Sequence, residues 1–218
     1  MGKNRRVFGY FEIVFDMLYL CIAGIAGAYI LSQAKEPGQI LAGSMILVLG
    51  GGDAFHLVPR ILVVLTGKEE WLSRALGFGK LVTSVTMTAF YVLLWHIGLL
   101  IFSPEGMALW TGTVYALAAL RVLLCLFPQN RWFDKKPPVK WGIYRNIPFF
   151  LLGAVVSGLY FVYRGSAIQL SWMWMAILLS FVFYIPVVLW VNRSPKLGML
   201  MFPKTCAYIW IVFMCLTI

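Results

Sequence analysis

Long apolar runs separated by short polar segments make up almost the whole chain. Seven runs reach or approach the roughly 17–25 residues that a helix needs to cross a bilayer. They lie near residues 9–32, 40–65, 79–102, 107–127, 144–164, 170–192 and 203–218. Between them stand turn-forming segments such as Lys35–Gly38 and Ser103–Gly106, as expected between antiparallel helices. The pattern predicts an all-α polytopic membrane protein, with one bundle of about seven transmembrane helices over residues 1–218.

The composition supports this class. Hydrophobic residues make up 61% of the chain and charged residues only 12%, whereas soluble domains are roughly 45–50% apolar and about 25% charged. So few charges could not cover a core this apolar in water. The four cysteines fall inside predicted helices without CxxC spacing, which favours packing over disulfides or metal binding.

Basic residues predict the orientation. If the N-terminus is cytoplasmic, the inner segments hold fifteen Lys and Arg residues and the outer loops hold two, Lys35 and Arg164. The inner set is Lys3, Arg5, Arg6, Arg60, Lys68, Arg74, Lys80, Arg131, Lys135, Lys136, Lys140, Arg145, Arg193, Lys196 and Lys204. The positive-inside rule then predicts a cytoplasmic N-terminus and an external C-terminus in the plasma membrane. It also accounts for the net charge of +10 without a nucleic-acid partner.

A weak internal repeat relates the two ends of the chain. Three short matches occur in the same order: Phe8–Glu12 with Trp141–Arg145, Pro59 with Pro186, and Leu76–Lys80 with Leu200–Lys204. They favour a 3+1+3 parallel repeat of residues 8–102 and 141–218, joined by the helix at 107–127. The alternative is that aromatic belts and positive-inside bias alone produce similar helix starts. If the repeat is real, a ligand site between the two units is expected.

Three charged residues inside the apolar runs are expected at one depth. A rise of about 1.5 Å per residue places Asp16, Asp53 and Arg121 roughly 10 Å from the inner surface. Charges in such positions usually face the bundle interior, where they form pairs or serve a function. Three helices therefore bring ionisable groups to one level of the bundle.

Further polar residues gather just below that level. Glu12 lies one turn before Asp16, while His56 and Arg60 share a helical stripe with Asp53. Other polar side chains at compatible levels are Lys80, Arg145, Asn146, Tyr184, Lys204 and Tyr208. We expect a polar cavity that opens toward the cytoplasm.

Each group also has a structural interpretation. Asp16 with Arg121, or Asp53 with a nearby base, would form an ion pair that fixes helix packing. Arg60, Lys80 and Lys204 would anchor helices at the head groups through their long side chains. The run Gly50–Gly52 would allow close helix packing or loosen the helix beside a cavity.

The leading functional hypothesis is a transporter or binder of a small anionic molecule. Arg60, Lys80, Arg121 and Arg145 would bind the substrate, because guanidinium groups pair well with carboxylate and phosphate groups. Carboxylates of Glu12, Asp16 and Asp53, together with His56, would serve as proton or gate residues. The predicted outer half carries few polar residues, so the sequence shows no outward path.

The first alternative is a membrane-embedded enzyme acting on a lipid or lipid-linked phosphate. Asp53 and His56, with Glu12 and Asp16, would hold a divalent metal that activates water. This metal signal is weak because the usual motifs carry more than one histidine. His56 and His96 cannot share a metal, since their predicted depths differ by roughly 18 Å.

The second alternative is a structural or regulatory membrane subunit. The chain has nine tryptophans and sixteen phenylalanines, but lipid-facing helices need such apolar faces as well. The expected partners are the lipid bilayer and a small-molecule ligand, with a homo-oligomer left open. No sequence motif identifies a cofactor, a reaction or a family.

Overall fold

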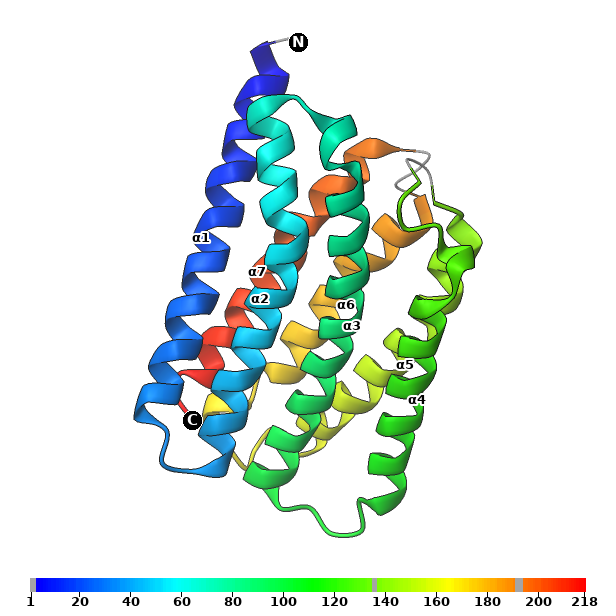
Figure 1. Ribbon diagram of the computed structural model, residues 1–218. Helices are drawn as coiled ribbons and strands as arrows, with labels where there is room; N and C mark the ends of the chain where they lie inside the picture. The colour runs from blue at the N-terminus through cyan, green and yellow to red at the C-terminus, as the bar shows by residue number, and fades with distance from the viewer. Residues whose placement is uncertain (1–2, 135–136, 191–193) are drawn as a thin grey trace.

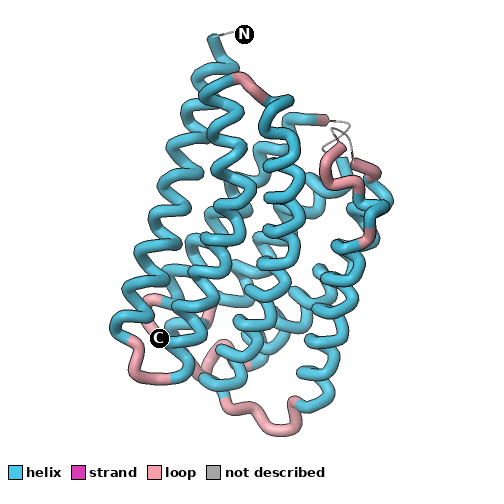
Figure 2. Tube along the Cα trace, in the orientation of Figure 1, coloured by secondary structure: helices cyan, strands magenta, loops and turns pink. Residues whose placement is uncertain are grey.

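The computed structural model describes residues 3–134, 137–190 and 194–218. The described residues form seven α-helices and no strand: α1 (Lys3–Gln33), α2 (Pro37–Thr66), α3 (Glu69–Phe102), α4 (Ala108–Leu126), α5 (Val139–Val162), α6 (Met173–Trp190) and α7 (Met201–Cys215). Three short 3₁₀ segments precede α5, α6 and α7: η1 (Pro128–Asn130), η2 (Ile168–Leu170) and η3 (Pro195–Leu200). Helix dominates the trace, and the loops lie at the two ends of the bundle (Figure 2).

The described chain contains seven helical segments long and apolar enough to cross a membrane. This confirms the all-α class and the predicted number of candidate spans, and it indicates an integral membrane protein. An α-helix satisfies its backbone hydrogen bonds within its own segment, which lipid requires. The N-terminal end of α1 and the C-terminus lie at opposite ends of the bundle (Figure 1). We call these the N-terminal end and the C-terminal end of the bundle.

Several helices extend beyond the apolar runs that predict them. The largest difference is in α3, which begins at Glu69 rather than near residue 79. Its first turn carries Glu69 and Glu70, whose negative charge is favourable at a helix N-terminus. Hydropathy identifies the part of a helix that suits lipid, whereas hydrogen bonding and capping decide where the helix ends.

The end of the first interhelical turn illustrates this capping. Glu36 is the N-cap of α2 and forms a capping box with Gln39, so α2 already begins at Pro37. Proline suits the first helical position because its missing N–H has no intrahelical partner there. Gln39 also donates from Nε2 to the carbonyl of Ile218 at 3.0 Å, which ties α2 to the end of the chain.

Helices that follow one another in sequence pack side by side around the bundle (Figure 1). In addition, α7 contacts α1 and α2, and α3 contacts α5. In both predicted repeat units the middle helix packs on the first and the third. Consecutive antiparallel helices pack in this way with or without a duplication, so the repeat stays a prediction.

Glycines allow α2 and α3 to approach closely. A Cβ atom on Gly79 would collide with the backbone carbonyl of Phe55, and one on Gly52 would collide with the side chain of Thr86. Thr83 completes the contact by donating from Oγ1 to the carbonyl of Gly52 at 3.0 Å. Small residues serve the same purpose wherever helices pack in lipid. Gly52 of α2 and Gly79 of α3 therefore act as packing sites.

Candidate functional site

A polar cavity of about 270 Å³ lies inside the bundle and takes its walls from α2 to α7. Arg121 near the end of α4 and Arg145 near the start of α5 both line it. These two helix ends meet at the N-terminal end of the bundle (Figure 1). The cavity therefore lies toward that end, with residues Pro137, Pro138 and Val139 forming part of its wall.

Four cationic side chains line the cavity, one each from α3, α4, α5 and α7: Lys80, Arg121, Arg145 and Lys204. His56 of α2 is also part of the wall. Among the described residues, no aspartate or glutamate lines this cavity. The charges are therefore of one sign, in a protein interior where electrostatic interactions are stronger than in water.

Arg121 is the most deeply buried of these cations, with 2% of its surface exposed. Its guanidinium carbon lies 3.3 Å from the ring centre of Phe149, a cation–π contact. Nε and Nη1 are buried without a hydrogen-bond partner in the described chain. Leaving a buried charged donor unpaired costs free energy. The side chain thus retains donors for an oxyanion.

Arg145 is held by the segment that connects α4 to α5. Its Nη1 donates to Oδ1 of Asn130 at 2.8 Å, and its guanidinium carbon lies 4.1 Å from the ring centre of Trp132. Asn130 in turn donates from Nδ2 to the carbonyls of Leu124 and Phe127 at 2.7 and 2.9 Å, closing the end of α4. The helix terminus, the loop and the cavity wall are therefore one hydrogen-bonded unit.

Lys204 lines the cavity and also interacts electrostatically with Asp53, which lies outside it. The side chain is 8% exposed, and Nζ lies 5.0 and 4.9 Å from the ring centres of Tyr184 and Tyr208. It interacts electrostatically with Asp53 on one side and with Arg121 on the other. One lysine thus contributes to the positive cavity and balances a carboxylate outside it.

A cluster of three buried aromatic rings packs beside the cavity. The rings of Tyr91, Phe149 and Phe181 lie with centres 5.2 to 5.5 Å apart, and all three are buried. Phe149 also forms part of the cavity wall, directly against Arg121. Such close aromatic contacts are stabilising. These rings form a cluster, called here the aromatic floor, that meets the cavity wall at Phe149.

The predicted carboxylates lie outside the cavity, on α1 and α2. Glu12 forms an ion pair with Arg60, and Tyr19 donates a hydrogen bond from its OH to Oδ2 of Asp53 at 2.7 Å. Asp16 is also buried nearby and interacts electrostatically with both Arg60 and Asp53. The predicted residues therefore form two groups, a cationic cavity and an acidic cluster beside it.

This arrangement corrects one structural interpretation. Among the described residues, Arg121 forms no ion pair with Asp16 or with any other carboxylate. Equal depth along two helices does not bring side chains together, because each must also point toward the other. Arg60, the fourth predicted cation, is paired with Glu12 and does not line the cavity.

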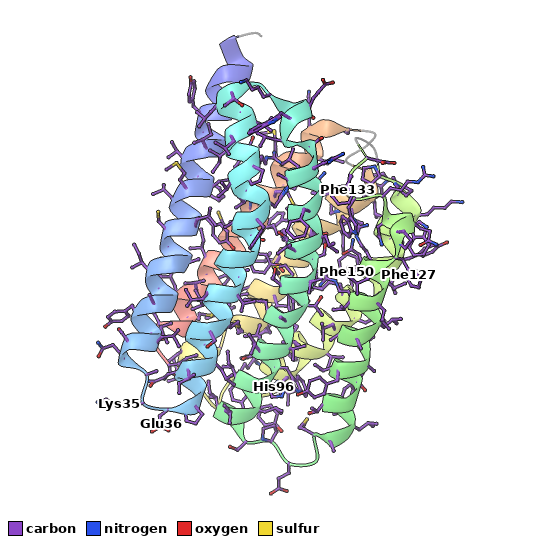
Figure 3. All side chains as sticks on the ribbon, in the orientation of Figure 1. Lys35, Glu36, His96, Phe127, Phe133 and Phe150 are labelled. Carbon is purple, nitrogen blue, oxygen red and sulfur yellow. The ribbon has the colours of Figure 1, made fainter. Side chains whose placement is uncertain are left out.

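The predicted metal-binding groups are not assembled. Within the part of the chain that the structure describes, no three His, Cys, Asp or Glu side chains are placed to hold one metal ion. His56 lines the cavity, whereas Asp53 bonds to Tyr19. His96 lies toward the C-terminal end of the bundle, as do Lys35 and Glu36 (Figure 3). It bonds to the carbonyl of Val92 and to the hydroxyl of Tyr115.

Three residues contribute to the cavity in ways that the sequence pattern does not predict: Lys204, Asn130 and Trp132. Lys204 resembles a head-group anchor in sequence, and only its burial shows that it faces the interior. Asn130 and Trp132 belong to a basic loop that positive-inside bias explains by itself. That loop lies at the N-terminal end of the bundle, where Phe127 and Phe133 are labelled (Figure 3). The presence of an asparagine and a tryptophan in so short a basic loop is the sequence feature that could have indicated these contacts.

The described residues therefore indicate a class, an integral membrane protein with seven candidate spans and an internal cavity lined by cationic side chains. Comparisons with protein-family models, with curated proteins and with solved structures found no match for the chain. Function must therefore be argued from the cavity itself.

Proposed function

We propose that the protein is a transporter or binder of a small anionic molecule and that the cationic cavity is its binding site. The observation that carries the proposal is the lining, which has four cations and no carboxylate among the described residues. Like charges gathered in a poorly solvated space repel one another. An anion bound among them replaces this repulsion with attraction.

The fixed positions of the two arginines support specific binding of an oxyanion, beyond nonspecific electrostatic attraction. Arg121 rests against Phe149 and Arg145 against Trp132, so aromatic rings limit the movement of both guanidinium groups. A planar guanidinium held in this way presents N–H donors in its own plane, which suits carboxylate and phosphate oxygens. Preorganised donors lose little conformational entropy when a ligand binds.

The cavity is expected to face the cytoplasm of a cell with the protein in its plasma membrane. Basic residues are concentrated at the N-terminal end, which the positive-inside rule assigns to the cytoplasm. In a variant without native cysteines, Lys68→Cys should react with an impermeant maleimide only after the cells are opened. Glu105→Cys, in the turn between α3 and α4, should react in intact cells. The reverse pattern would overturn this orientation.

The packed aromatic floor is consistent with one state of a transporter, in which the three rings contact one another. An anion would enter from the N-terminal end, and passage would require the Tyr91–Phe149–Phe181 contacts to separate. Uptake of radiolabelled anion into proteoliposomes distinguishes a transporter from a binder. The enzyme and subunit hypotheses gain no specific contact from the described residues and stay predictions.

Anion-dependent stabilisation tests the binding site directly. Protein in mild detergent would be unfolded thermally with acetate, citrate, sulfate or phosphate at constant ionic strength. A ligand at 100 times its Kd should stabilise the protein by about 2.7 kcal/mol. Arg145→Leu should remove this effect, whereas Arg74→Leu, which replaces an exposed arginine on α3, should retain it. If none of the anions stabilises the wild-type protein, the proposal fails.

A further inference from the structure

The cavity carries more positive charge than a simple carboxylate can balance. Two lysines and two arginines line it, whereas two carboxylates outside the lining interact with them electrostatically, Asp53 with Lys204 and Glu69 with Lys80. A ligand with a single negative charge would leave the remaining cations repelling one another in a medium of low dielectric constant. Charge balance therefore requires a ligand with two or more negative charges.

The hydrogen-bonding capacity of the wall points the same way. Lysine and arginine side chains are donors without acceptor capacity. Three polar neutral side chains of the wall use donors on backbone carbonyls: Thr83 donates to Gly52, Ser84 to Lys80 and Asn146 to Gly142. A ligand group that presents acceptor oxygens to these cations therefore fits such a wall.

A phosphoryl group meets both conditions. It carries nearly two negative charges near pH 7 and presents three strong acceptor oxygens. The two cation types suit it as well, because arginine contacts phosphate with a planar fork and lysine with a mobile point charge. A carboxylate has only two oxygens and one charge. The cavity volume of about 270 Å³ is below the usual range of about 300–1,000 Å³ for drug-sized ligands, which favours a small ligand.

The different burial of the cations predicts the orientation of the bound ligand in the cavity. Arg121 is buried and has two nitrogens without a hydrogen-bond partner, Nε and Nη1, whereas Lys80 is exposed. Arg121 also contacts the aromatic floor through Phe149. The most strongly charged part of the ligand is expected against Arg121, with the rest of the molecule directed toward the N-terminal end of the bundle.

We infer that the cavity recognises a phosphoryl or pyrophosphoryl group, with Arg121 and Lys204 at its deep end and Arg145 and Lys80 around it. The inference rests on the proposed anion-binding function and specifies its ligand class. The phosphoryl group belongs either to a soluble phosphate ester or to a lipid head group.

Binding of inorganic anions to the full-length protein in mild detergent tests the inference. Calorimetry would compare pyrophosphate, orthophosphate, citrate and acetate at constant ionic strength, with a chelator present to remove divalent cations. Pyrophosphate should bind at least about tenfold more tightly than acetate, because added charge-assisted hydrogen bonds each contribute to affinity. Orthophosphate should lie between them.

Two lysine variants connect the preference to the cavity. Lys204→Met and Lys80→Met should each weaken pyrophosphate binding by about tenfold and acetate binding by much less. Lys80 is exposed, so its replacement keeps the test valid even if the buried Lys204 variant folds poorly. Lys196→Met removes an exposed lysine of η3 that does not line the cavity and should leave both affinities unchanged.

The outcomes separate the inference from the proposed function. Equal affinities for acetate and pyrophosphate, or tighter binding of citrate, would overturn the phosphoryl assignment and leave an anion site. Absence of binding by every anion would overturn both. Displacement of pyrophosphate by glycerol 3-phosphate or by phosphatidic acid in the micelle would support the inference, and the stronger competitor identifies a soluble or a lipid source.

Discussion

Replacing Arg121 with leucine is expected to abolish anion binding while the bundle still folds. Arg121 is buried against Phe149 and has no carboxylate partner among the described residues. Losing its charge and donors should weaken binding about 100-fold or more, since removing a buried hydrogen-bonded charge from a complex costs 2–5 kcal/mol. The Kd for the tightest-binding anion of the wild-type protein is the measurement.

The thermal stability of Arg121→Leu should be maintained or increased, although its anion affinity falls. An uncompensated buried charge is destabilising, so the removal of this charge offsets the packing that the shorter leucine side chain loses. Arg121→Leu should therefore unfold at the same temperature as the anion-free wild-type protein or at a higher one. Arg121→Lys keeps the charge but loses the planar fork, and should bind with intermediate affinity. Wild-type affinity in Arg121→Leu would remove this residue from the site.

Substitution of Gly79 with alanine is expected to give a large loss of stability. The new Cβ atom would overlap the backbone carbonyl of Phe55, which cannot rotate away as a side chain can. Separation of α2 from α3 at this point should cost about 2–3 kcal/mol, in the range of overpacking substitutions. The same shift would displace His56 from the cavity wall, so anion affinity should fall as well.

Gly51→Ala is the matched control for that substitution. Gly51 lies in the adjacent α2, and a Cβ atom built on it meets nothing within 4 Å. Alanine favours a helix interior over glycine by about 1 kcal/mol, so this variant should be unchanged or slightly more stable. Unfolding by SDS in mixed micelles compares the two. Equal stability of both variants would contradict the close α2–α3 packing.

The sequence by itself determined the class, the spans and the level of the charges. The apolar runs identify the seven candidate spans of the described residues, because a helix that crosses lipid needs about 20 predominantly apolar residues. The rise along a helix also placed Arg121, Lys80 and Arg145 at compatible depths, and all three do line one cavity. The depth of a residue in the bundle depends only on its position along its own helix, so it can be read from the sequence.

The tertiary structure decided which of those residues face one another. Asp53 and His56 differ by about 60° around the axis of α2, yet one bonds to Tyr19 and the other lines the cavity. Arg60 shares their stripe and pairs instead with Glu12 on α1. The rotation of each helix against its neighbours fixes these partners, and that rotation depends on packing contacts such as Gly79 against Phe55.

In the loop before α5, the side-chain contacts are even less predictable from the sequence. Asn130 and Trp132 hold Arg145 in place, but their contacts join a helix end, an irregular segment and a second helix. No periodicity describes such a segment, so its side chains have no predictable face. Apolar length and charge along the chain thus determined a membrane bundle with a positive end. Helix rotation and loop geometry, which depend on long-range contacts, decided that four cations share one cavity without a carboxylate among its described lining.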